Sequence, residues 1–272
     1  MRSTKNLKSA FITFEGVEGS GKSTIINKLY DDLRDRGPDY DIICNAVKYR
    51  VTKYSDPGTT NLGKQLKSVI MDNANDISSI GEAFLFAAAR SQLVKDCIGP
   101  DLYFGDNENA KLVLCDRYID SNLVYQTQGN PKLIDKDICN INDLATKYYF
   151  NSPSGAQYYF SCIPDLTLIL DVDPEITLRR QFENGCERNS FDMRSLDFHR
   201  RIREAYLNLA KTNTNTYKVI DASRSLTDVY VDVLNAIQSK VREVSLNRNS
   251  DDTGTNLNSD WSNSKSNFIF PI

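Results

Sequence analysis

The chain has few of the residues that build metal centres and disulfide frameworks. Among its 272 residues there is one histidine, His199, and the six cysteines are scattered with no C-x-x-C pair. Zinc centres and dithiol redox motifs need ligands at short, regular spacings. The sequence therefore shows no such metal-ligand pattern, and the cysteines are interpreted as reduced intracellular thiols.

Long apolar runs and an excess of basic charge are also absent. No segment approaches the roughly 18 apolar residues of a membrane-spanning helix, and the first residues lack the core of a signal peptide. The net charge is −3, which gives no sign of a nucleic-acid surface. We therefore expect a cytoplasmic protein with no membrane and no nucleic-acid partner.

What the chain does contain is a phosphate-binding loop. Gly16, Gly21, Lys22 and Ser23 fit the pattern G-x-x-x-x-G-K-[ST], after the apolar run Phe11–Phe14 and before apolar residues at helical spacing. Successive backbone N–H groups and a helix N-terminus bind phosphates, while the lysine reaches the β- and γ-phosphates and the serine hydroxyl binds Mg²⁺. The predicted ATP-binding residues are Gly16, Val17, Glu18, Gly19, Ser20, Gly21, Lys22, Ser23 and Thr24.

Strand-like and helix-like segments alternate along the chain. This alternation predicts one α/β domain over residues 1–246, with a parallel sheet covered by helices on both faces and ligands bound at the carboxyl ends of the strands. The four predicted strands are Phe11–Phe14, Lys111–Cys115, Leu166–Val172 and Tyr217–Ile220. The predicted helices lie near residues 25–33, 62–70 and 84–94, and at Phe191–Leu209 and Leu226–Val241.

Four segments fall outside this alternation. Asp35–Tyr54 holds a possible strand at Asp41–Cys44, and Gly99–Asn109 is predicted to be a surface loop. Gln128–Pro164 receives no assignment. Residues 247–272 are rich in Asn and Ser, which is typical of a disordered tail.

A second chemical signal is Asp116-Arg117-Tyr118, which follows the apolar run ending at Cys115. A carboxylate at the end of a strand beside a phosphate-binding loop is suited to organise Mg²⁺, and a neighbouring arginine can bind phosphate with two donors. Taken alone, the tripeptide is better explained by a strand-end turn with a surface salt bridge. The later Ser121 and Tyr125-Gln126 favour the functional interpretation.

Five ordered motifs resemble the thymidylate kinase family of bacterial and viral type. They are Phe14–Thr24, Leu85–Arg90, Asp116–Gln126, Pro164–Pro174 and Val219–Ser223, and the resemblance spans residues 11–238. It implies a P-loop nucleoside-monophosphate-kinase fold with a lid at about residues 178–191, ATP and Mg²⁺ as cofactors, dTMP as acceptor, and a homodimer.

The resemblance also implies roles for single residues. Glu18 would contact the 3′-hydroxyl of the acceptor, Phe86 would stack on thymine, and Arg90 would donate to a thymine carbonyl. From the residues alone, Phe86 is better explained as a core side chain, because Phe84 and Leu85 adjoin it. Arg90 is as well explained as a side chain on a solvated helix face. The implied catalytic residues are Lys22, Asp116, Arg117 and Arg188; the metal ligands are Ser23 and Asp116; the acceptor-binding residues are Glu18, Phe86, Arg90, Arg117, Ser121, Asn122 and Tyr125.

Two segments depart from the family pattern. Ser55–Thr60 stands where the family has R-E-P-G-G-T, so the acceptor phosphate loses a cationic contact that Arg50 or Lys53 would have to replace. In the lid, the expected basic cluster is absent around Phe182, which leaves Arg179, Arg180 and Arg188 as candidates.

The predicted activity is transfer of the γ-phosphoryl group of ATP to dTMP. A kinase of the same fold that acts on another deoxynucleotide or deoxynucleoside remains open. A catalytically weak nucleotide-binding module also remains open, because of the lid and the altered turn. A GTPase is disfavoured, since no apolar strand leads into an N-K-x-D tetrad.

Overall fold

The computed structural model describes residues 9–35, 49–72, 74–103, 110–129, 135–151, 157–183 and 195–246. Three of the predictions above lie outside these residues. They are the possible strand at Asp41–Cys44, the lid beyond residue 183 with Arg188, and the tail 247–272.

The centre of the fold is a parallel sheet, as predicted. The strands lie in the order β2-β3-β1-β6-β7, and each neighbouring pair is parallel. Their bounds are β1 Ala10–Glu15, β2 Tyr49–Ser55, β3 Ala110–Asp116, β6 Leu166–Asp171 and β7 Tyr217–Asp221. Every residue of β1 is buried, which fits a central strand covered on both faces.

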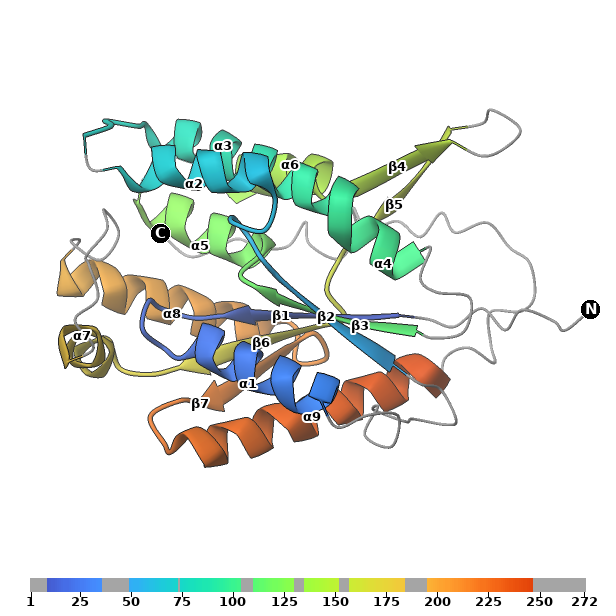
Figure 1. The fold of residues 1–272 in the computed structure, drawn as a ribbon. Coiled ribbons are helices and arrows are strands. Elements are labelled where there is room, and N and C mark those ends of the chain that lie inside the picture. Colours follow the sequence, from blue (N-terminus) through green and yellow to red (C-terminus); the bar gives the residue numbers. More distant parts are fainter. Residues whose placement is uncertain are drawn as a thin grey trace, which may run out of the picture.

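Helices cover both faces of this sheet (Figure 1). One face carries α1 (Lys22–Asp35) and α9 (Leu226–Leu246), which contact each other and the strands between them. The other carries α3 (Ser79–Leu93), α5 (Ile119–Gly129) and α8 (Leu196–Thr212). The helices α2 (Asn61–Met71) and α6 (Asp135–Ala145) pack on α3, and α7 (Pro174–Glu183) packs on α8.

The segment predicted as a surface loop is partly helical, so that prediction is wrong for Gly99–Tyr103. A π-helical segment, Val94–Ile98, continues α3 and leads into α4 (Gly99–Tyr103). Pro100 lacks the N–H group that would continue the ladder of helical hydrogen bonds, and this interruption falls where the wider π-helical turn passes into α4. The packing also favours the helix, since Val94 and Ile98 are fully buried.

The unassigned segment after Gln128 contains α6 and a two-stranded antiparallel sheet, β4 (Lys147–Asn151) with β5 (Gln157–Ser161). This hairpin extends from the end of α6 near α4 (Figure 1). The ring of Tyr103 on α4 stacks on that of Phe160 on β5, with ring centres 4.0 Å apart, and this contact joins the hairpin to α4. Within the hairpin, the ring centres of Phe150 and Phe160 are 5.0 Å apart. Of the helices in the described part of the chain, none combines the length and the hydropathy needed to cross a membrane.

Candidate active site

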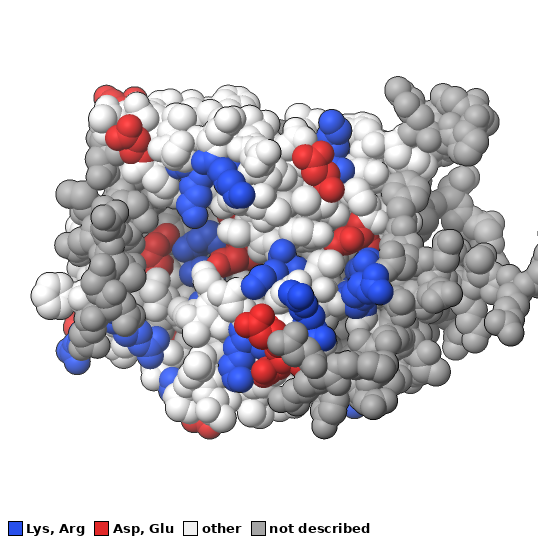
Figure 2. Space-filling model, in the orientation of Figure 1, with Lys and Arg blue, Asp and Glu red and all other residues white. Residues whose placement is uncertain are grey.

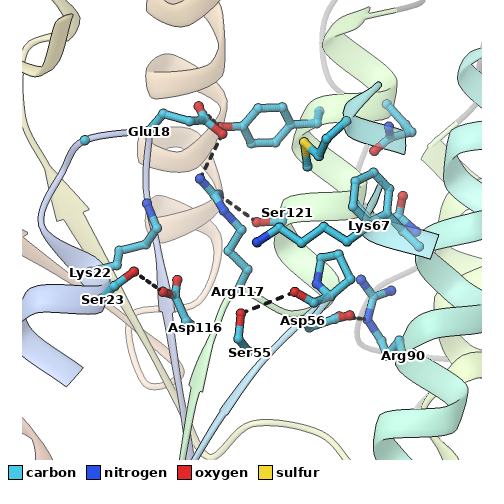
Figure 3. Close-up of a pocket in the computed structure, with 17 residues that line it drawn as sticks. Glu18, Lys22, Ser23, Ser55, Asp56, Lys67, Arg90, Asp116, Arg117 and Ser121 are labelled. Atoms are coloured by element: carbon cyan, nitrogen blue, oxygen red, sulfur yellow. Dashed lines mark hydrogen bonds and ion pairs between the residues drawn. The ribbon is translucent and has the colours of Figure 1, made fainter. Parts of the chain in front are cut away.

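A cavity of about 470 Å³ lies at the carboxyl ends of β1, β2 and β3, where the parallel sheet predicts a ligand site. Figure 3 shows it between the loop after β1 on one side and helices on the other. On the face drawn in Figure 2, basic side chains are interspersed with acidic ones. The cavity is lined by Glu18, Gly19, Lys22, Ser23, Ser55, Asp56, Pro57, Lys67, Met71, Phe86, Arg90, Asp116, Arg117, Ser121, Asn122, Tyr125 and Gln126.

The loop between β1 and α1 has the backbone of a phosphate-binding loop. Gly16, Gly19 and Gly21 have φ angles of 138°, 74° and 93°, in the left-handed region that favours glycine. At Gly16 a Cβ would also lie 2.6 Å from the Leu170 carbonyl oxygen, so no other residue fits between the loop and β6. The predicted order of strand, glycine loop and helix is confirmed.

Lys22 is folded onto its own loop. Its Nζ donates to the carbonyl oxygens of Gly16 at 3.0 Å and Val17 at 2.8 Å, and to the Ser20 hydroxyl at 3.2 Å. Burial lowers the pKa of Lys22 to about 8, and the positive charge of Arg117 adds to this effect. A phosphate bound in the loop would add negative charge beside this ammonium group and so favour its protonated form.

Ser20 and Val17 are buried, and Val17 belongs to the main core. The side chain of Val17 is therefore structural. Thr24 is exposed in the first turn of α1.

Ser23 and Asp116 form the oxygen pair expected of a magnesium site. The Ser23 hydroxyl donates to Asp116 Oδ2 at 2.5 Å, joining the start of α1 to the end of β3. In the described residues no group of three or more His, Cys, Asp or Glu side chains is placed to hold a metal. Two hard oxygen ligands suit Mg²⁺, which keeps several waters and takes the rest of its ligands from nucleotide phosphates.

Arg117 joins the two sides of the cavity. Its Nη2 donates to Glu18 Oε1 at 3.0 Å, and its Nη1 donates to the Gly16 carbonyl at 3.1 Å and to the Ser121 hydroxyl at 3.0 Å. The φ of Arg117 is 65°, a sparsely populated conformation that persists only where the surroundings hold it. The prediction that Arg117 lies beside the phosphate-binding loop is confirmed.

Glu18 is held as a carboxylate inside an anion-binding loop. Tyr125 donates its phenol hydrogen to Glu18 Oε2 at 2.6 Å, and Arg117 binds the other oxygen. Burial alone would raise the pKa of Glu18, but the positive charges of Arg117 and Lys22 outweigh burial and lower it. The predicted residues Glu18, Arg117, Ser121 and Tyr125 therefore form one connected group.

Glu15 is a residue of this group that the sequence did not reveal. Its carboxylate accepts the backbone N–H groups of Tyr118 at 2.8 Å and Ser121 at 3.3 Å, and the hydroxyls of Ser121 at 2.6 Å and Tyr206 at 2.9 Å. The end of β1 thus caps the start of α5 and fixes the segment that carries Arg117. Burial raises the pKa of Glu15 to about 7, and the negative charge of Asp120 adds to it.

Arg90 is buried, so the interpretation as a solvated side chain is wrong. Only 1% of it is exposed. Its Nε donates to Asp56 Oδ2 at 2.6 Å, its Nη1 to Asn142 Oδ1 at 2.6 Å, and its Nη2 to the Tyr118 carbonyl at 3.1 Å. Burial raises the pKa of Asp56, while Arg90 opposes the rise. These partners position the guanidinium group, whose edge lines the cavity.

Two amide oxygens on the same wall are buried without a hydrogen bond from the described residues. They are Asn122 Oδ1 and Gln126 Oε1, and both residues line the cavity. A buried acceptor without a donor is costly, so each favours a ligand that brings an N–H or O–H group. Phe86 also lines the cavity, and it is partly buried against the main core.

The turn after β2 lines the cavity, but Arg50 and Lys53, considered as replacements for the missing arginine of this turn, do not. Ser55, Asp56 and Pro57 line the cavity, whereas Arg50 and Lys53 are not among the lining residues. Lys53 instead donates to Asn27 Oδ1 at 2.8 Å. Lys67 of α2 lines the cavity. No sequence pattern pointed to it, because its position beside the turn depends on how α2 folds back.

The chain is similar to known proteins over most of its length. The family model described as thymidylate kinase matches residues 14–143 and 154–233. The chain is 33% identical over 239 residues to the thymidylate kinase of Bacillus pumilus (strain SAFR-032), covering 87% of this chain and 99% of the relative. It is 37% identical over 231 residues to that of Symbiobacterium thermophilum, covering 85% and 93%. The chain belongs to the thymidylate kinase family.

All residues that line the cavity lie in the ranges matched by the thymidylate kinase family model. The matched ranges include every lining residue from Glu18 to Gln126 and extend over α8 and β7. Of the arginines considered for the lid, Arg180 donates to the carbonyl of Ala222 at 3.2 Å, within the motif Val219–Ser223. Arg188 lies in the matched range but outside the described residues.

Proposed function

We propose that this chain catalyses the phosphorylation of dTMP to dTDP with ATP as the donor. The observation that carries the proposal is a single cavity that brings together Lys22, the Ser23–Asp116 oxygen pair and Arg117. ATP would bind along the loop before α1, and dTMP would bind on the side formed by α2, α3 and α5. Membership in the thymidylate kinase family supports both the reaction and the acceptor.

On the acceptor side, each group has a chemical reason for its role. Phe86 offers a ring for stacking on thymine, and Arg90 offers guanidinium hydrogens to a thymine carbonyl. The unpaired Asn122 Oδ1 suits the ring N–H of thymine. Glu18 accepts the 3′-hydroxyl hydrogen, and Tyr125 beside it leaves little room for a 2′-hydroxyl.

The transfer step is an in-line displacement. An oxygen of the acceptor phosphate forms a bond to the γ-phosphorus of ATP, and the bond from that phosphorus to the β–γ bridging oxygen breaks to release ADP. Lys22 and Arg117 would hold the donor and acceptor phosphates, and Arg188 would add positive charge from the lid at about residues 178–191. Ser23 and Asp116 would hold Mg²⁺, whose charge would offset that of the donor phosphates.

One coupled assay tests the proposal. The purified protein is given ATP and Mg²⁺ with dTMP, dUMP, dGMP, dCMP or thymidine, and ADP release is followed. We expect turnover to be highest with dTMP. Turnover of another acceptor without dTMP would replace the assignment with a related kinase. Tight nucleotide binding without turnover of any acceptor would support the binding-module alternative.

We also propose that the protein is a homodimer, as the family resemblance implies. The exposed apolar side chains of α2, α3 and α6 support this, because such side chains gain most from burial against a second copy. These side chains are Leu62, Val69, Ile80, Phe84 and Leu144. A cytoplasmic location stays a prediction from the sequence.

A further inference from the structure

The acceptor phosphate needs more positive charge than Arg117 supplies. A phosphate monoester carries a charge of nearly −2 at neutral pH. Arg117 is already paired with Glu18 at 3.0 Å, and Glu15 lies 4.0 Å away. The guanidinium group is therefore already paired with Glu18 before any ligand binds, so a second cation facing the phosphate would strengthen its binding.

Two of the other cations that line the cavity are committed elsewhere. Lys22 is bound to the carbonyls of its own loop, where the donor phosphates are expected. Arg90 is buried against Asp56 at 2.6 Å. Lys67 is exposed and lines the cavity, and no residue in the described part of the chain forms an ion pair or hydrogen bond with its ammonium group.

Lys67 also lies beside the turn after β2, in which Ser55 stands where the family pattern has an arginine. A Cβ built on Gly58 would lie 3.8 Å from Lys67 Cδ and 3.8 Å from Ser55 Oγ, so both side chains flank the same point of the turn. In Figure 3 the Lys67 side chain extends from α2 toward the middle of the cavity and toward the side that carries Arg117, whose guanidinium group points to Glu18. The ammonium group can thus reach the space that a long side chain at position 55 would fill.

We propose that Lys67 binds the phosphate of the acceptor nucleotide and replaces the arginine that is missing at Ser55. The inference rests on the proposed function for the identity of the acceptor. A lysine on α2 acts as a point charge at the end of a flexible stem, so it contributes charge and leaves the geometry to Arg117. The proposal predicts that Lys67 recognises the phosphate and not the base.

The test uses calorimetry to measure how tightly dTMP and thymidine bind to the wild type and to Lys67→Ala. We expect the dissociation constant of dTMP to rise by about tenfold or more, since a hydrogen bond between charged groups is lost. The dissociation constant of thymidine should stay within about twofold of the wild-type value, because thymidine has no phosphate to bind a lysine. Lys64→Ala, an exposed lysine one turn earlier on α2, is the matched control and should change neither constant. Ser55→Arg added to Lys67→Ala should restore much of the dTMP affinity.

Equal losses for dTMP and thymidine, or no loss for either, would overturn the role of Lys67. If the wild-type protein binds and phosphorylates a different monophosphate, the proposed function fails, and the same comparison is made with that nucleotide and its nucleoside. If the wild-type protein binds no nucleoside monophosphate, both proposals are overturned. A wild-type enzyme active on dTMP with an unaffected Lys67 variant rejects this inference alone.

Discussion

Phe86 belongs both to the core and to the cavity, and its replacement separates these two roles. We expect Phe86→Ala to raise the dissociation constant of dTMP about tenfold to a hundredfold, because stacking of an aromatic ring on a base is worth about 1–3 kcal/mol. The affinity for ATP should be nearly unchanged. Calorimetry with each nucleotide gives both values.

The control for this variant is Tyr149→Ala, which removes an exposed ring on β4 that does not line the cavity. It should leave the binding of both nucleotides unchanged. A similar loss of dTMP and ATP affinity in Phe86→Ala would show that the ring is only a core residue.

Glu15 makes stability depend on pH in a direction that can be worked out. Because its pKa is about 7 in the folded protein against the ordinary 4.5, the folded state binds more protons than the unfolded chain between these values. The contribution of this carboxyl to the free energy of unfolding is therefore present at low pH and is lost as the pH rises through 7. A shift of this size corresponds to about 3 kcal/mol.

Glu15→Gln removes this titration. We expect the free energy of unfolding of the wild type, minus that of Glu15→Gln, to fall by about 2–3 kcal/mol from pH 5 to pH 8 in urea titrations. Glu175→Gln, at a surface ion pair with Arg200, is the matched control and should follow the wild type. If the free energies of unfolding of the wild type and Glu15→Gln changed in parallel with pH, the titration of Glu15 would not be the cause.

At the level of single residues, the sequence predicted the groups that belong to contiguous motifs. Lys22, Asp116 and Arg117 could be placed because their neighbours along the chain define their strand, loop or helix. Arg90 could not be understood this way, because its partners Asp56 and Asn142 are distant in the sequence. Glu15 was missed for a related reason: an acid at the end of a strand gives no sign that it caps a helix about a hundred residues later.

Among the elements, the junction between the π-helical segment and α4 depends on Gly99. A Cβ at this position would lie 2.2 Å from Cδ2 and 2.3 Å from Cγ of Tyr148 on β4. We expect Gly99→Ala to lower the free energy of unfolding by about 1–3 kcal/mol, because the β4–β5 hairpin must move to relieve the clash. Urea unfolding measures the loss.

A double-variant cycle shows whether the Tyr148 ring is the cause. In a Tyr148→Ala background the same Gly99→Ala change should cost much less, because the clashing ring is gone. Equal costs in both backgrounds would mean that the glycine is needed for the helix backbone and not for the contact with β4.

The elements that the sequence failed to predict lie at the edges of the fold. The central strands β1, β3 and β6 are nearly continuous apolar runs because both of their faces are buried. The edge strand β2 carries Arg50 and Lys53 among partly exposed residues, so its composition resembles that of a loop. The β4–β5 hairpin rests on stacked rings from separate segments, which no local periodicity reveals.

For the whole molecule, the proposed homodimer gives the last test. Phe84 on α3 is 58% exposed. The helices α2 and α6 both pack on α3, and each also has exposed apolar side chains. Leaving these side chains in water is unfavourable, and a second copy of the same face would bury them. Sedimentation of the wild type should therefore give about twice the chain mass of 30.8 kDa at micromolar concentration.

Phe84→Glu would place a charge in that interface, and we expect it to shift the protein to the mass of one chain, 30.8 kDa. Tyr149→Glu, which charges an equally exposed ring on the β4–β5 hairpin, should leave the dimer intact. Since Phe84 does not line the cavity, the single chain should still bind dTMP. A wild type that sediments as one chain would contradict the dimer, and a dimer unchanged by Phe84→Glu would exclude this face as its interface.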